Sequence, residues 1–147
     1  MQMHTNESAP RVVVGVDGSQ PSYAALRWAI RHATMIGGAV DAVAAWEPPS
    51  HYGWSAPVVD TSLDKDLAER RFTEELHQVL GADPPVEVRE HLVMGDPSDV
   101  LLTAAKGAEV LVVGSRGHSS VTRALLGSVS TRCAQHATCP VVIVRPQ

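Results

Sequence analysis

Glycine and serine residues in the C-terminal third of the chain form the pattern with the clearest chemical meaning. Gly114-Ser115-Arg116-Gly117 is followed, nine residues later, by Gly127-Ser128-Val129-Ser130. The apolar run Val110–Val113 directly precedes the first group and is typical of a buried strand. The pattern therefore lies where a parallel strand ends and the next helix begins, which is where α/β proteins bind nucleotides.

Each residue type in this pattern suits the binding of phosphate. Gly114 and Gly117 allow the backbone to turn and to present N–H groups to phosphate oxygens, and Gly127 allows a close approach. Ser128 and Ser130 supply hydroxyl donors. The helix that begins at these serines adds a partial positive charge at its N-terminus.

Other side chains are placed to complete a nucleotide site. Arg116 or Arg123 can pair with a phosphate, and Asp17 can accept from a ribose hydroxyl or help to hold Mg²⁺. Ala44 and Ala45, near the end of a predicted strand, are small enough to admit an adenine ring. Ordinary turn chemistry is the alternative, because glycine and serine are common turn residues, and it is the better interpretation of residues 17–19 taken alone.

Several other chemistries have no motif in the sequence. It contains no P-loop, no G-x-G-x-x-G dinucleotide fingerprint and no G-x-S-x-G nucleophile elbow. Cys133, His136 and Cys139 are spaced in a way that suggests zinc, but no fourth ligand stands nearby in sequence. Cys133 is better interpreted as a small core residue, and no metal site is predicted.

The elements that position these residues alternate along the chain. Ser19 and Asp96 are expected N-caps, each followed by a proline in the first helical turn. Alternation of strands and helices favours an α/β fold, a parallel sheet with helices on both faces. The predicted strands cover 11–16, 40–46, 86–93, 110–113 and 141–144, and the predicted helices cover about 20–35, 63–80, 97–106 and 128–137.

Composition sets the class of protein. A length of 147 residues indicates one domain, over 11–147, and the polar segment 1–10 is expected to be a disordered tail without a signal-peptide core. The chain has 12 Lys+Arg against 16 Asp+Glu, which disfavours nucleic acid as a partner. No apolar stretch is long enough to span a membrane. With only two cysteines, a reducing cytoplasm is the expected location.

The last predicted strand, Val141–Val144, carries no charge. If it lies at an edge of the sheet, its free backbone groups are open to pairing with another chain. We therefore expect a homodimer formed through this strand. The alternative is that a helix or the C-terminal tail covers the edge.

Four segments together resemble the universal stress protein family. They are VVVGVDGS at 12–19, VMGDPSDVL at 93–101, VLVVGSRG at 110–117, and LLGSVS at 125–130 with CPVVIVRP at 139–146. The resemblance implies a five-stranded sheet in the order 3-2-1-4-5, Rossmann-like, with dimerisation through the fifth strand. It also implies ATP binding, since the Gly-x2-Gly-x9-Gly-Ser spacing is intact. The segment His51-Tyr52-Gly53-Trp54 resembles actinobacterial members.

By position, the resemblance implies that Gly15 and Asp17 contact the nucleotide and that the two Gly-Ser groups hold phosphates and ribose. It implies a nucleotide-responsive regulator of the stress response with an unidentified protein partner, rather than a fast enzyme. A slow ATPase or autophosphorylating protein, with Ser119, Ser120 or Thr122 as acceptor, and a nucleotide-free interaction module are the alternatives. The predicted site comprises Gly15, Asp17, Ala45, Gly114, Ser115, Arg116, Gly117, His118, Ser119, Gly127, Ser128, Val129 and Ser130.

Overall fold

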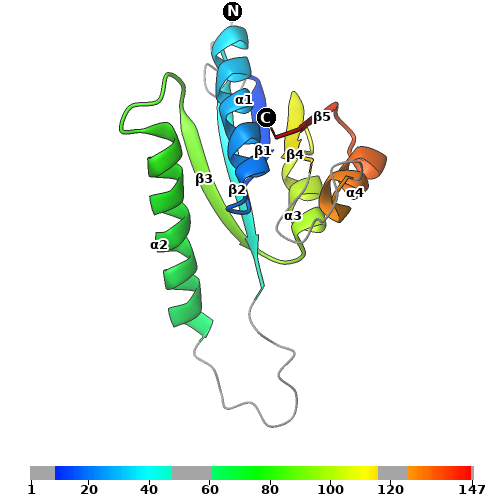
Figure 1. Ribbon diagram of the computed structural model, residues 1–147. Helices are drawn as coiled ribbons and strands as arrows, with labels where there is room; N and C mark the ends of the chain where they lie inside the picture. Colours follow the sequence, from blue (N-terminus) through cyan, green and yellow to red (C-terminus); the bar gives the residue numbers. More distant parts are fainter. Residues whose placement is uncertain (1–8, 48–60, 116–125, 147) are drawn as a thin grey trace, which may run out of the picture.

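The computed structural model describes residues 9–47, 61–115 and 126–146, and within them strands and helices alternate (Figure 1). The alternation predicted from the sequence is confirmed. In chain order the elements are β1 (Arg11–Gly15), α1 (Gln20–Ile36), β2 (Ala39–Trp46), α2 (Thr61–Leu80), β3 (Val88–Met94), α3 (Pro97–Ala104), β4 (Val110–Gly114), α4 (Ser128–His136) and β5 (Val141–Val144).

The strands form one parallel sheet in the order β3-β2-β1-β4-β5. This confirms the order that the family resemblance implied. The chain moves outward from β1 through β2 to β3, then crosses to the other side of β1 and continues through β4 to β5. The direction of winding therefore changes between β1 and β4, where Val12 pairs with Val110 and Val14 with Val112.

Each face of the sheet has its own apolar core. On the first face, side chains such as Val12, Val14 and Val112 pack with α1 and with Phe72 and Leu76 of α2. On the second face, the neighbouring strand positions pack with α3 and with α4, whose Cys133 is fully buried. Alternate residues of the central strands thus face opposite cores, as the pleat of a strand requires.

The predicted helix starts are confirmed. The Ser19 side chain caps α1 by accepting from the N–H of Ser22, and the Asp96 side chain caps α3 by accepting from the N–H of Asp99. The helix ends were less accurate: α3 stops at Ala104 because the chain then turns toward Gly107, which has a φ of 77°. Among the described residues, no helix has the length and apolar character needed to cross a membrane.

Candidate functional site

The carboxyl ends of β1 and β4 meet where the winding of the sheet reverses. After β1 the chain enters α1 on the first face, and the helix that follows β4, α4, packs on the second face (Figure 1). A parallel sheet opens a crevice at such a point, because the two connections leave in opposite directions. The described members of the predicted site from these connections lie at this end of the sheet; they are Gly15, Asp17, 114–115 and 127–130.

The N-terminus of α4 has no side-chain cap. Gly127 is the N-cap residue, and the first helical hydrogen bond runs from the N–H of Thr131 to its carbonyl, at 3.0 Å. The N–H groups of Ser128, Val129 and Ser130 therefore have no partner within the helix. Uncapped amides of this kind, with the dipole of the helix behind them, form an anion-binding position.

Ser115 connects the end of β4 to α4 and to β5. Its N–H donates to the carbonyl of Val144 at 2.9 Å, and its carbonyl accepts from the N–H of Gly127 at 2.7 Å. The hydroxyl of Ser130 lies 3.1 Å from the same carbonyl and 3.0 Å from that of Gly127. In this structure the Ser130 hydroxyl therefore donates to backbone, although we expected it to donate to phosphate.

The hydroxyl of Ser115 is itself a buried polar group. The residue is 1% exposed, and no described residue hydrogen-bonds its Oγ. A buried hydroxyl without a partner costs free energy, about 1–3 kcal/mol. Groups of this kind in native proteins call for an explanation such as a ligand or an ordered water.

Two glycines of the predicted site lie in close contact with neighbouring helices. A Cβ on Gly114 would lie 2.8 Å from the backbone carbonyl carbon of Pro21 in α1, and a Cβ on Gly15 would lie 2.7 Å from Cδ1 of Leu101 in α3. From the sequence, Gly114 is expected to turn the backbone toward a ligand. The structure adds a second reason for glycine, which is the close approach of α1 to the end of β4.

Asp17 lies exposed in the turn between β1 and α1. Its Oδ1 accepts from the N–H of Ser19 at 3.0 Å and from the Ser19 hydroxyl at 2.5 Å. Its own N–H donates to Ser22 Oγ at 3.3 Å. Gly18 between them has a φ of 83°, in the left-handed region that glycine tolerates. These bonds fix the direction of the carboxylate beyond the carboxyl end of β1.

The end of β2 contributes two neighbouring residues on opposite faces. Ala45 is half-buried and packs against the second core, across from Val93 of β3. The indole Nε1 of Trp46 is buried, and none of the described residues accepts from it. The only signal for this buried donor in the sequence is an aromatic residue at the end of a predicted strand.

Part of the predicted site lies outside the described residues. This applies to Arg116, Gly117, His118 and Ser119, and also to Arg123. Their contribution to the site stays a prediction. The described part of the site is therefore made of backbone groups of β1, β4 and α4, together with Asp17 and Ala45.

The cysteines have the properties of core residues. Burial raises the pKa of the Cys133 thiol to about 11 and also raises the pKa of Cys139, so both thiols are protonated at neutral pH. The prediction that Cys133 is a core residue is confirmed by its complete burial. In the described parts of the chain no three acidic, histidine or cysteine side chains are arranged to hold a metal ion.

The parallel sheet in the order β3-β2-β1-β4-β5, with helices on both faces, defines a Rossmann-like α/β protein. The sequence model of the universal stress protein family matches residues 9–145, so the chain belongs to this family. A universal stress protein of Mycolicibacterium smegmatis is 35% identical over 143 residues, which are 97% of this chain and 48% of that protein. One of Mycobacterium tuberculosis is 32% identical over 139 residues, 90% of this chain and 47% of that protein. The chain thus spans about half the length of these curated relatives.

Solved structures share the fold. The universal stress protein UspA of Lactobacillus plantarum superposes with a TM-score of 0.72 at 21% identity, covering 92% of this chain and 97% of that one. A universal stress protein in complex with cAMP gives 0.69 at 27% identity, covering 93% and 97%. A family protein of Arabidopsis thaliana with AMP bound gives 0.60 at 21% identity, covering 94% and 92%.

Proposed function

We propose that this chain binds ATP, with Mg²⁺, in the crevice between β1 and β4 and acts as a nucleotide-responsive regulator in the stress response. The observation that carries the proposal is the N-terminus of α4, which has no side-chain cap, beside the buried hydroxyl of Ser115, which has no hydrogen-bond partner among the described residues. Three N–H groups without a partner in the helix, and a hydroxyl without a partner among the described residues, suit the oxygens of a phosphate chain. The bound cAMP and AMP named for two of the structural relatives support a nucleotide.

The crevice residues have distinct roles in this proposal. The backbone of 127–130 holds phosphates, with Gly117 and its neighbours, which lie outside the described residues, completing the loop. Asp17 accepts from the ribose or holds Mg²⁺, and Gly15 lies beside it. The adenine lies against Ala45, whose small side chain leaves room for a ring. ATP would supply the negative charge to which the α4 terminus is complementary.

Replacing Ser128 with Asp tests the position of the phosphates. An acidic residue in the first turn favours the helix itself, because it complements the helix dipole. The same carboxylate would repel a phosphate at the α4 terminus. We expect Ser128→Asp to keep or raise the thermal midpoint and to lower Mg-ATP affinity by at least roughly tenfold, which corresponds to 1.4 kcal/mol.

Gln135→Glu is the matched control, since it makes the same charge change in the last turn of the same exposed helix face. Calorimetric titration of nucleotide-stripped protein with Mg-ATP, AMP and cAMP measures both variants beside the wild type. Equal Mg-ATP affinities in the two variants would show that the phosphates do not bind at the N-terminus of α4. No binding of any nucleotide by the wild type would favour an interaction module that uses the same fold.

Incubation with ATP and Mg²⁺ distinguishes a slow ATPase or an autophosphorylating protein from a protein that only binds ATP. Released phosphate or labelled protein at stoichiometric enzyme would add catalysis to binding. Its proposed acceptors, Ser119, Ser120 and Thr122, lie outside the described residues. No increase in free phosphate or in labelled protein with time would indicate that the chain binds ATP without catalysis.

The proposal includes a homodimer through β5, a cytoplasmic location, one domain over 11–147 and a regulatory protein partner. The dimer is supported by the position of β5 at the sheet edge and by its four uncharged residues, each of which is partly exposed. No described strand pairs with the outer side of β5.

A further inference from the structure

The other edge of the sheet, β3, presents a defined set of free backbone groups. The N–H of Val40 donates to the carbonyl of Glu87, and the N–H of Gly95 donates to the carbonyl of Trp46, both at 2.9 Å. With Val40 opposite Val88 and Trp46 opposite Met94, the parallel ladder alternates along β3. The outward N–H and C=O groups therefore belong to Val88, Glu90, Leu92 and Met94, and no strand in the described ranges pairs with them.

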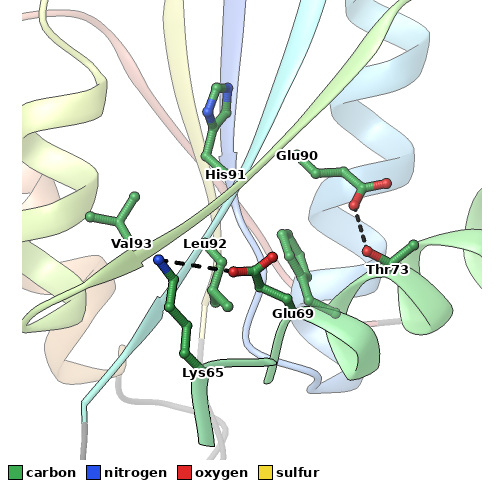
Figure 2. A pocket seen from close by; sticks show the side chains of 8 residues that line it. Lys65, Glu69, Thr73, Glu90, His91, Leu92 and Val93 are labelled. Atoms are coloured by element: carbon green, nitrogen blue, oxygen red, sulfur yellow. Dashed lines mark hydrogen bonds and ion pairs between the residues drawn. The ribbon is translucent and has the colours of Figure 1, made fainter. Parts of the chain in front are cut away.

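A groove lies directly beside this edge. A cavity of about 320 Å³ is lined on one side by α2, from Lys65 to Thr73, and on the other by residues 90–93 of β3. Phe72 and Leu92, which pack with the first core, are its apolar lining. Figure 2 shows the lining side chains of α2 and β3 on the two sides of this groove. The groove adjoins the stretch of β3 that carries the outward backbone groups of Glu90 and Leu92.

The polar rim of the groove carries excess negative charge. Glu69 faces Lys65 at 4.0 Å, with both side chains at least half exposed, and Glu90 accepts from the Thr73 hydroxyl at 2.9 Å (Figure 2). An exposed ion pair of this length is weak, so Glu69 remains available to another cation. The Glu90 carboxylate has no cationic partner among the described residues. Two carboxylates thus face one ammonium group.

The end of the same edge is apolar and exposed. Val93 is 41% exposed and Met94 is 58% exposed, and they point to opposite sides of the strand. An exposed edge of this kind is what an extended segment of another protein recognises when it adds a strand to a sheet. Backbone groups supply the affinity, and alternate side chains supply the specificity.

We propose that the outer edge of β3, with the groove under α2, binds an extended segment of a partner protein in which apolar and basic side chains alternate on one face. The segment pairs with the outward groups of Glu90 and Leu92. One of its apolar side chains lies on Phe72 and Leu92, and a basic side chain lies between Glu69 and Glu90. This surface is at the edge of the sheet opposite β5, so it is independent of the nucleotide and dimer proposals.

A short, capped, fluorescent peptide serves as the probe, with valine and arginine alternating on one face and threonine on the other. Its anisotropy is measured with the full chain. A control peptide has proline at its centre, which removes a backbone donor, and a second has glutamate for each arginine. We expect the first peptide to bind and both controls to bind at least tenfold more weakly, a difference of about 1.4 kcal/mol.

Protein variants distinguish peptide binding in the groove from general electrostatic attraction to the protein surface. Glu90→Lys reverses a charge on the rim, and Glu74→Lys makes the same change on the exposed face of α2 away from the groove. Only Glu90→Lys should lower the affinity for the peptide, by roughly tenfold. Amide hydrogen exchange of the wild type should slow at Glu90 and Leu92 when the peptide is bound. Absence of binding, equal weakening in both variants, or unchanged exchange at these amides would each overturn the proposal.

Discussion

The Asp41 carboxylate accepts a hydrogen bond from Nε of Arg89, 2.7 Å away on the neighbouring strand. The two residues are directly opposite in the register of β2 and β3. The other carboxylate oxygen accepts from Arg11 of β1 at 3.1 Å, and His91 Nε2 lies 3.2 Å from the first. A carboxylate only 9% exposed in the middle of a sheet is therefore surrounded by cationic groups from both neighbouring strands.

This arrangement predicts a loss of stability in acid. Burial raises the pKa of Asp41, but hydrogen bonds from Arg11, Arg89 and His91 and the charge of Arg89 outweigh it and lower the pKa below its usual value. A lowered carboxyl pKa stabilises the fold fully above the unfolded value of about 3.9, and the contribution is lost as the pH falls through the folded pKa. Urea unfolding between pH 7 and pH 3 measures this dependence.

Asp41→Asn should remove that part of the acid dependence and lower the free energy of unfolding at neutral pH by roughly 2–3 kcal/mol, because Arg11 and Arg89 lose their counter-charge. Asp83→Asn, in an exposed turn, is the control and should change it by less than about 0.5 kcal/mol. Parallel acid profiles for wild type and Asp41→Asn would show that Asp41 is not responsible.

Tyr23 should ionise late in an alkaline titration. Burial, followed by its hydrogen bond to Glu75 at 2.5 Å, raises its pKa to about 12. A raised tyrosine pKa stabilises the fold fully below the unfolded value of about 10, and the contribution is lost as the pH rises through about 12. In a Tyr52→Phe background, Tyr23 is the remaining tyrosine. Its absorbance change near pH 10 in native protein would contradict the prediction.

Two glycine substitutions should differ in cost because their neighbours differ in freedom. Gly114→Ala would place a Cβ against the backbone of Pro21, which moves only if α1 moves, and should destabilise by about 2 kcal/mol. Gly15→Ala would meet the tip of the Leu101 side chain, which can rotate, and should cost less. Chemical denaturation of both variants gives the comparison, and a larger loss for Gly15→Ala would refute this account.

The β5 edge can be tested through its backbone. Leu111 and Ser115 donate to the carbonyls of Pro140 and Val144, so the N–H groups of Val141 and Ile143 point away from β4. Ile143→Pro removes an outward donor and keeps the β4 ladder, so we expect a folded monomer by light scattering. Val142→Pro removes an inward donor and should instead destabilise the fold. A dimer mass for folded Ile143→Pro would exclude pairing through this edge.

The sequence predicted the parts of the fold that depend on local patterns. Ser19 and Asp96 were identified as caps because a short polar side chain before a helix and a proline in its first turn act within one turn. The buried strands followed from their apolar runs. The sheet order came from the family resemblance, since periodicity alone does not say which strands are neighbours.

The interactions between distant segments were not predicted. Asp41 was a visible signal, a charge within an apolar strand, but its partners come from two other strands. The close contact between Gly114 and Pro21 and the hydrogen bonds that hold Ser115 depend on how α1, α4 and β5 meet around β4. None of these contacts produces a periodic pattern in the sequence from which it could be predicted. The residues Arg116–Ser119 of the predicted site lie outside the described chain.

The backbone N–H and C=O of Ser115 bond to different elements. The N–H donates to the last residue of β5, and the C=O accepts from the N-cap residue of α4. A shift in either neighbour therefore alters the hydrogen bonding of a single residue that both share. Under the proposed function, this makes self-association and nucleotide occupancy thermodynamically linked, and such linkage is reciprocal. Apparent nucleotide affinity would then vary with protein concentration, and the dissociation constant of the dimer would vary by the same factor with nucleotide.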